Sequence, residues 1–301
     1  MKSPMTAPRR LTLAAAPIAA LILLVGVASG AQAAIPPGLG TADSFVVLAG
    51  AGVTNTNTTT LSGNLGSADG NVVGDTDLVF TSGSNHYGDG VTTGAMLDLE
   101  AAFGSASQPA DVTVSADLGG QSLVPGVYFQ ASTMNLSGPA LTLDAGGDPD
   151  AVWIFRAGAD LIVGPGASVN LINGAQACNV YWQVASSASL DDGADLVGTV
   201  MARTSISLNS AATVQGRVLA LDGTVTLIGN TITRPVCAAA PPPVAPPTGP
   251  QVPAVPSGSV ATGDGSTSLG SFDLFLLAAG VAAIGAGATA VVARRRRGWA
   301  A

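Results

Sequence analysis

Residues 200–233, VMARTSISLNSAATVQGRVLALDGTVTLIGNTIT, contain the pattern that decides the fold. Short runs such as 206–208 and 225–227 place an apolar side chain at every second position, and Gly, Asn or Ser residues separate them. A period of two in runs this short indicates β-strands, because a helix repeats its apolar positions every three to four residues.

The same unit of three short strands occurs five times between residues 123 and 235, at intervals of 18 to 28 residues. Residues 45–62 fit the same template. Repeats of this length with Gly and Asn at the corners are typical of a β-solenoid, in which each coil buries its neighbour. The sequence therefore predicts a mainly β fold, a three-sided β-solenoid with an apolar column inside.

The first side of each coil is apolar at inward and outward positions alike. We expect these residues to point inward: Val127, Phe129, Val152, Ile154, Val180, Trp182, Val218 and Ala220. We expect these to point outward: Tyr128, Trp153, Phe155, Tyr181, Met201, Leu219 and Leu221. A strand that is apolar on both faces must be covered on both. The predicted cover is one α-helix from Thr93 to Phe103, with Thr93 as its N-cap and Gly104 as its end. The alternative is that Trp153 and Tyr181 stack on carbohydrate.

The other two sides present small polar residues and no array of charges. Outward positions of the second side are Thr133, Asn135, Ser137, Ser189, Ser205, Ser207, Asn209, Thr224 and Thr226. Those of the third side are Thr60, Ser62, Thr142, Ser168, Asn170, Thr213, Gln215, Thr231 and Thr233. A flat grid of hydroxyl groups suits a flat, repeating ligand, whereas a small molecule needs a concave pocket. The alternative interpretation is that Thr and Ser are ordinary strand formers on a solvated face.

The charge of the chain excludes several classes of function. Between residues 34 and 240 there are 17 acidic residues and four arginines. Such a surface repels phosphate, so we expect no nucleic-acid partner. The chain has one histidine, His86, which argues against His-based metal sites and His-centred catalytic triads. No cofactor and no metal site are expected.

The N-terminal segment has the features of a targeting signal. Lys2, Arg9 and Arg10 precede an apolar run and the small-residue pattern Ala-Gln-Ala at 31–33. This order predicts a secretory signal peptide over 1–33, with the twin-arginine pathway as an alternative to the general one.

Composition changes again after the repeats. We expect a β-solenoid domain over 34–237, a Pro/Gly/Ser-rich stalk over 238–271, a transmembrane or sorting helix over 272–293, and an Arg-rich cytoplasmic tail over 294–301. Together with the signal peptide, these segments predict an exported protein at the cell surface, held by the membrane or the cell wall.

Residues 259–264, SVATGD, lie just before the apolar segment. Thr-Gly followed by an apolar helix and an arginine cluster resembles a degenerate sortase sorting signal, in which Thr262 would be joined to the cell wall. A plain membrane anchor explains the same features. Sortase and the cell wall are therefore alternatives to the membrane alone as partners.

Two cysteines, Cys178 and Cys237, fall in the exported part. An oxidising compartment and an even count favour one disulfide between them. It would tie the last strand to the body of the domain.

Several long motifs resemble the ice-binding-protein-like family. They are LGTADSFVVLA at 39–49, GNLG at 63–66, LVPGVY at 123–128, DAVWIF at 150–155, GAQACNVYWQV at 174–184 and QGRVLA at 215–220. The resemblance covers about residues 36 to 235. It implies a right-handed, discontinuous β-solenoid with a helix along one side, and a first coil packed beside the last.

The resemblance also implies adsorption to ice through one flat side rich in Thr, Ser and Ala. We place the ice face on the second side, with these candidate residues: Thr133, Asn135, Ser189, Ser205, Ser207, Thr224 and Thr226. Asp160, Ile162 and Asp191 interrupt that side, so the third side, with Thr231 and Thr233 as its best pair, is the runner-up surface.

Three other functions stay open from the sequence. The same fold serves a surface adhesin or structural cell-wall protein without ice activity. A polysaccharide-cleaving enzyme would use the clustered Asp191, Asp192 and Asp195 as acid and base, although these acids also suit a polar corner, and we expect no enzyme. Two acidic pairs, Asp75 with Asp77 and Asp148 with Asp150, are candidates for Ca²⁺ without a full ligand loop.

Overall fold

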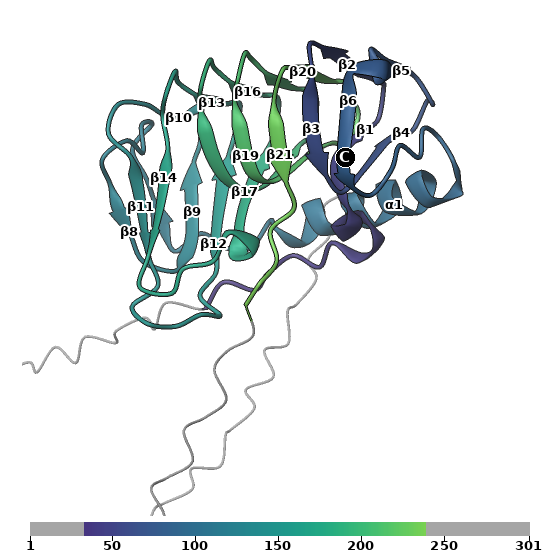
Figure 1. Cartoon of the computed structure of the whole chain (residues 1–301). Coiled ribbons are helices and arrows are strands. Elements are labelled where there is room, and N and C mark those ends of the chain that lie inside the picture. The colour runs from purple at the N-terminus through teal and green to yellow at the C-terminus, as the bar shows by residue number, and fades with distance from the viewer. Residues whose placement is uncertain (1–32, 239–301) are drawn as a thin grey trace, which may run out of the picture. The chain divides into compact units, whose positions relative to one another are not determined.

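The computed structural model describes residues 33–238, which form a parallel β-solenoid with an α-helix along one side (Figure 1). Apart from Ala33 and Ala238, the predicted signal peptide, stalk, apolar helix and arginine tail lie outside the described residues, as does Thr262. Within residues 33–238, no helix is long and apolar enough to cross a bilayer. The described residues bury their apolar side chains among themselves, so this part of the chain contains its own core.

Each coil passes through three sides, which we name a, b and c. They correspond to the first, second and third sides predicted from the sequence. Side a consists of β7 (Val112–Thr113), β9 (Gly126–Gln130), β12 (Trp153–Ala157), β15 (Val180–Val184), the C-terminal parts of β17 (Asp195–Ala202) and β19 (Thr213–Ala220), β1 (Phe45–Ala49) and β4 (Asn64–Ser67), in that spatial order. Side b consists of β10 (Met134–Leu136), β13 (Leu161–Val163), β16 (Ala188–Leu190), β18 (Ile206–Leu208), β20 (Val225–Ile228), β2 (Val53–Thr56) and β5 (Val72–Val73). Side c consists of β8 (Ser122–Leu123), β11 (Leu141–Asp144), β14 (Val169–Ile172), the N-terminal parts of β17 and β19, β21 (Thr231–Thr233), β3 (Thr59–Ser62) and β6 (Leu78–Ser82).

Short 3-10 helices and one α-helix connect these strands. They are η1 (Gly40–Ser44), η2 (Asp75–Asp77), η3 (Ala177–Asn179) and α1 (Gly90–Ser105). These elements confirm the predicted mainly β fold, with parallel sheets and a helix.

Two strands run around the corner from side c to side a without a break. β17 and β19 pair from Asp195 with Thr213 through Ala202 with Ala220, and Gly198 stands opposite Gly216 at the corner. A Cβ on Gly216 would lie 1.7 Å from the carbonyl oxygen of Gly198. β19 approaches β17 this closely only because Gly216 has no side chain, and a Cβ on Gly198 would in turn lie 2.6 Å from the carbonyl oxygen of Val180 at the start of β15.

The first coil of the sequence packs beside the last, as the family resemblance predicts. β1 pairs with β19, β2 with β20 and β3 with β21, all in parallel. We call this junction the seam. β21 therefore lies inside the stack, between β19 and β3, and not at its end.

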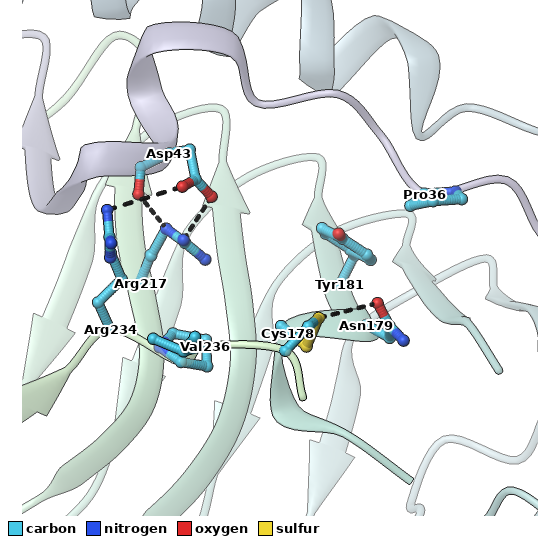
Figure 2. Close-up of a pocket in the computed structure, with 10 residues that line it drawn as sticks. Pro36, Asp43, Cys178, Asn179, Tyr181, Arg217, Arg234 and Val236 are labelled. Atoms are coloured by element: carbon cyan, nitrogen blue, oxygen red, sulfur yellow. Dashed lines mark hydrogen bonds and ion pairs between the residues drawn. A yellow bond between two sulfur atoms is a disulfide. The ribbon is translucent and has the colours of Figure 1, made fainter. Parts of the chain in front are cut away.

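A buried arginine fastens the seam on side a. Arg217 on β19 is 2% exposed and donates to the carbonyl oxygen of Asp43 at 3.0 Å and to its carboxylate Oδ1 at 2.5 Å. It also donates to the hydroxyl of buried Thr199 at 3.2 Å. Arg234, just after β21, lies 3.7 Å from the other oxygen of the same carboxylate (Figure 2). Arg217 and Asp43 stand 174 positions apart in the sequence, so only the folded chain brings them together.

Inward and outward positions on side a were predicted correctly for β15 and β19 and wrongly for β9 and β12. Tyr128, Trp153 and Phe155 point into the central column, whereas Val127, Val152 and Ile154 face the helix. Phe129 also lies on the helix side, where the Arg156 guanidinium stands 5.3 Å from its ring. Because these strands are apolar on both faces, alternation alone does not define which face turns inward.

The register of the strands explains the observed orientation. Tyr128, Phe155 and Trp182 are paired along the ladder, and their rings stack inside the column with centroids 5.4 and 4.2 Å apart. Stacked rings fill the column better than a mixture of rings and small aliphatic groups would. Trp153 and Tyr181 are 0% and 6% exposed, so neither ring offers a face for carbohydrate stacking.

The helix α1 covers side a, as predicted, but its ends differ from the prediction. It begins at Gly90, and its N-cap is Asp89, whose carboxylate accepts hydrogen bonds from the backbone N–H groups of Val91 and Thr92. Thr93 lies inside the first turn, and Gly104 lies inside the last turn rather than after it. An aspartate side chain reaches two free N–H groups at a helix start, which makes Asp89 the stronger cap. The buried residues of the helix are Thr92, Ala95, Leu99 and Ala102.

Acid is expected to loosen the contact between α1 and η1. The carboxylate of Asp98 on α1 accepts two hydrogen bonds from Thr41, at 2.7 Å from its N–H and 2.5 Å from its hydroxyl. These bonds hold the pKa of Asp98 below its ordinary value of 3.8. A depressed pKa stabilises the folded state above pH 3.8, and this contribution is lost as the pH falls through the folded-state value. Asp98→Asn should therefore flatten the decline of the melting temperature between neutral and acidic pH. An unchanged acid profile in this variant would contradict the assignment.

Cys178 and Cys237 form the predicted disulfide, with Cα atoms 5.6 Å apart. It joins η3, just before β15, to the segment that follows β21. In the chain-entropy model, closing the loop between Cys178 and Cys237 stabilises the domain by a few kcal/mol.

Candidate functional site

Side b presents one outward row along its middle. The ladder pairs place these residues next to one another, in this order: Asn135, Ile162, Ser189, Ser207, Thr226, Thr54 and Val73. Neighbouring strands lie about 4.8 Å apart in the hydrogen-bonding direction. From Asn135 to Val73 the row contains no charged residue, and Asp117 pairs with Asn135 beyond its end. Four consecutive members, from Ser189 to Thr54, carry hydroxyl groups.

A second row flanks the first at the start of each strand. Its members are Thr133, Asp160, Ser187, Ser205 and Thr224. Some of their side chains form hydrogen bonds with the backbone of the next coil. Asp160 Oδ1 accepts from the N–H of Ser187 at 3.1 Å, and Ser205 Oγ accepts from the N–H of Thr224 at 3.2 Å. These bonds fix the orientation of the flanking groups, so the row is held rigidly.

The side is not level over its whole length. A shallow hollow of about 200 Å³ lies where Ile162, which is 40% exposed, stands next to the shorter Ser189 and Ser207. Asp160 and Ser187 border this hollow. We call the row of small residues from Ser189 on β16 to Thr54 on β2 the level part of side b; its first two members, Ser189 and Ser207, also line the hollow. The predicted residues Thr133 and Asn135 lie on the other side of the hollow, and the amide of Asn135 donates to the carbonyl oxygen of Ala116 at 3.3 Å.

Thr54 belongs to the same surface, although it was not among the residues predicted for it. Thr54 is exposed on β2 and pairs with Thr226 on β20, although the two residues are far apart in the sequence. The signal for it was the Gly-Val-Thr run at 52–54, together with the implied packing of the first coil beside the last. The five predicted residues from Ser189 to Thr226 lie together on side b with it.

Side c carries a wider hydroxyl surface with two outward rows. One row contains Asp195, Thr213, Thr231, Thr60 and Val79, and the other contains Gln215, Thr233, Ser62 and Ser82, beside the buried Val197. The charged Asp195 stands in the first of these rows and accepts a hydrogen bond from the hydroxyl of Thr213 at 2.6 Å. Side c is thus more mixed in size and charge than the level part of side b.

The clustered aspartates Asp191, Asp192 and Asp195 accept hydrogen bonds from residues of the next coil. Asp191 accepts a hydrogen bond from the amide of Asn209 at 3.1 Å, Asp192 from the N–H of Ser210 at 3.0 Å, and Asp195 from Thr213. Each carboxylate therefore has the structural role of a polar corner, and the three face different partners.

In each of the two aspartate pairs considered for Ca²⁺, a carboxylate accepts a hydrogen bond from the protein itself. Asp75 accepts from the hydroxyl of Tyr87 at 2.9 Å, and Asp148 accepts from the N–H of Asp150 at 2.9 Å. Residues 33–238 contain no group of three His, Cys, Asp or Glu side chains placed to hold a metal ion.

The fold and its surface define a parallel β-solenoid with one helix-covered side and, on another side, an uncharged row of hydroxyl-bearing residues from Ser189 to Thr54. The family model described as Ice-binding-like matches residues 47–233. An ice-binding protein of Nostoc sp. (strain HG1) is 34% identical over 220 residues, which cover 72% of this chain and 81% of that protein. The crystal structure of an ice-binding protein from an Antarctic biological consortium has a TM-score of 0.65 and 39% identity, covering 68% of this chain and 94% of that one.

A further solved relative has the same architecture. The crystal structure of an ice-binding protein from the ascomycete Antarctomyces psychrotrophicus has a TM-score of 0.65 and 37% identity, covering 67% of this chain and all of that one. This chain belongs to the ice-binding-like family.

Proposed function

We propose that this chain is an exported, surface-anchored protein that binds ice by adsorption through the level part of side b. Its membership of the ice-binding-like family supports ice as the ligand. The observation that carries the choice of surface is the uncharged row from Ser189 through Ser207 and Thr226 to Thr54, set at the strand spacing of a rigid ladder.

The proposed mechanism is adsorption without chemistry. Hydroxyl and methyl groups at fixed spacing order the adjacent water into a layer that merges with the ice lattice and pins the growing front. Threonine has few rotamers to lose, and the ladder already fixes the backbone, so contact costs little conformational entropy. Ser205 and Thr224 border the row and extend it across the strands.

The location is part of the same proposal. The signal peptide would export the chain, and the apolar segment would hold it at the membrane, with sortase transfer of Thr262 to the cell wall as the second mode of attachment. Ice at the cell surface is then the partner of the domain.

Ice-affinity partitioning of residues 34–240 tests the proposal. We expect the fragment to concentrate in a slowly grown ice phase and to inhibit recrystallisation, whereas an unrelated acidic protein of similar size stays in the liquid. Exclusion of the folded fragment from ice would refute the proposal and favour a surface adhesin or structural wall protein built on the same fold.

A further inference from the structure

The described chain leaves the solenoid at the corner opposite side b. β21 belongs to side c, and the residues after it turn toward side a, where Cys237 bonds to Cys178 of η3. Gln176 accepts a hydrogen bond from the N–H of Ala238 at 2.6 Å and donates to its carbonyl oxygen at 3.2 Å. In a three-sided prism, the corner between sides c and a faces away from side b (Figure 1).

The N-terminal segment lies at the same corner. Pro36 and Tyr181 line a hollow of about 400 Å³ together with the disulfide and the Asp43–Arg217 pair (Figure 2). Both ends of the described chain therefore leave side b unobstructed.

The disulfide determines which strands bear a pull on the C-terminal end. The loop closed by Cys178 and Cys237 contains every strand from β15 to β21, including those that carry Ser189, Ser207 and Thr226. With the bond intact, tension entering at Ala238 passes from Cys237 directly to Cys178. Without it, the same tension acts on the two hydrogen bonds between Ala238 and Gln176 and then on β21, which has three ladder positions on each side.

β21 is the strand whose detachment under such a load would disrupt the solenoid most directly. It fills side c between β19 and β3, so pulling it out would open the seam. β15, which follows Cys178, is longer, with five ladder pairs to β12 and four to β17. The disulfide thus moves the load from a short strand at the seam to a longer strand inside the stack.

We propose that the domain is an ice adhesive: side b holds ice while the chain leaving the opposite corner carries a load, and the Cys178–Cys237 disulfide keeps that load off β21. This inference rests on the proposed ice binding. It assigns to the molecule a bridging function that inhibition of ice growth in solution does not require.

The experiment compares two tethering points. Residues 34–271 are coupled to beads through a handle at either the C-terminus or the N-terminus, frozen onto ice, and pulled off at constant temperature below the melting point. The parent is compared with a Cys178→Ser, Cys237→Ser double variant. Both tethers leave at the same corner, but only the C-terminal tether passes its load through the disulfide.

We expect the double variant to lose adhesion under loads that the parent bears when tethered at the C-terminus, and to match the parent when tethered at the N-terminus. Equal detachment forces at the C-terminal tether would overturn the inference. A parent that detaches at once from both tethers, and is also excluded from ice in free solution, would instead overturn the proposed ice binding.

A second variant keeps the test decisive if the double variant does not fold. Ile232→Val weakens β21 by removing one methylene from the core while the disulfide stays intact. Because β21 bears no load in the proposed path, its detachment force at the C-terminal tether should equal that of the parent. A lower force would show that β21 carries the load and would overturn the inference.

Discussion

Thr226→Tyr is expected to abolish ice binding while the domain stays folded. Thr226 lies in the middle of the level row, with Ser207 on one side and Thr54 on the other. A tyrosine ring would rise above these two small neighbours and lift the face off the ice. A loss of about 1.4 kcal/mol of adsorption free energy lowers binding tenfold. Because the ring would hold most of the row away from the ice, we expect the loss of adsorption free energy to exceed that value. Ice-affinity partitioning and recrystallisation inhibition measure the loss.

Thr233→Tyr is the matched control for this prediction. Thr233 is an exposed threonine in a strand of similar length on side c, so the same substitution adds the same bulk to the other hydroxyl surface. Its activity should equal that of the parent. Loss of activity in Thr233→Tyr with retention in Thr226→Tyr would place the ice face on side c. Thr224→Tyr, at the flanking row of side b, should also reduce activity, though less than Thr226→Tyr.

Arg217→Ala should destabilise the domain by about 2–4 kcal/mol, because it leaves a cavity and removes donors from the Asp43 carbonyl and the Thr199 hydroxyl. Burial lowers the pKa of the Arg217 guanidinium, and the charge of Asp43 opposes that shift, so the side chain stays charged at neutral pH. Asp43 itself is 56% exposed on its side chain, which lets water solvate the carboxylate left behind. Urea unfolding measures the change in the free energy of unfolding.

Arg203→Ala provides the comparison at an exposed site. Arg203 pairs with Glu100 at 3.0 Å, but its side chain is 37% exposed. An exposed ion pair contributes about 0–1 kcal/mol, so this variant should unfold close to the parent. If Arg203→Ala and Arg217→Ala lowered the free energy of unfolding by the same small amount, the stability of the seam would not depend on the buried arginine.

Much of the fold was predictable from local pattern. Alternation in runs such as 206–208 and 225–227 identified the strands of side b, and the outward hydroxyl groups followed directly from it. The disulfide was predictable because the sequence has two cysteines, both in the predicted solenoid domain. Asp89 was missed as the helix cap because Thr93 stood closer to the apolar stripe that Leu99 anchors.

The orientation of β9 and β12 was not predictable by the same means. Both faces of these strands are apolar, so a period of two fits either orientation of Tyr128 and Trp153. Stacking of Phe155 between Tyr128 and Trp182 selects one orientation, and that choice depends on how neighbouring coils pack. The hollow beside Ile162 likewise depends on the heights of side chains from different coils.

The sequence by itself determined the strands, the three sides, the hydroxyl-rich faces and the disulfide, because each follows from local alternation or residue type. Only the tertiary structure decided that Thr54 continues the row of Thr226, that Arg217 fastens Asp43, and that the chain leaves opposite side b. These features depend on packing the first coil against the last, where side chains far apart in the sequence reach a shared surface that no local pattern records.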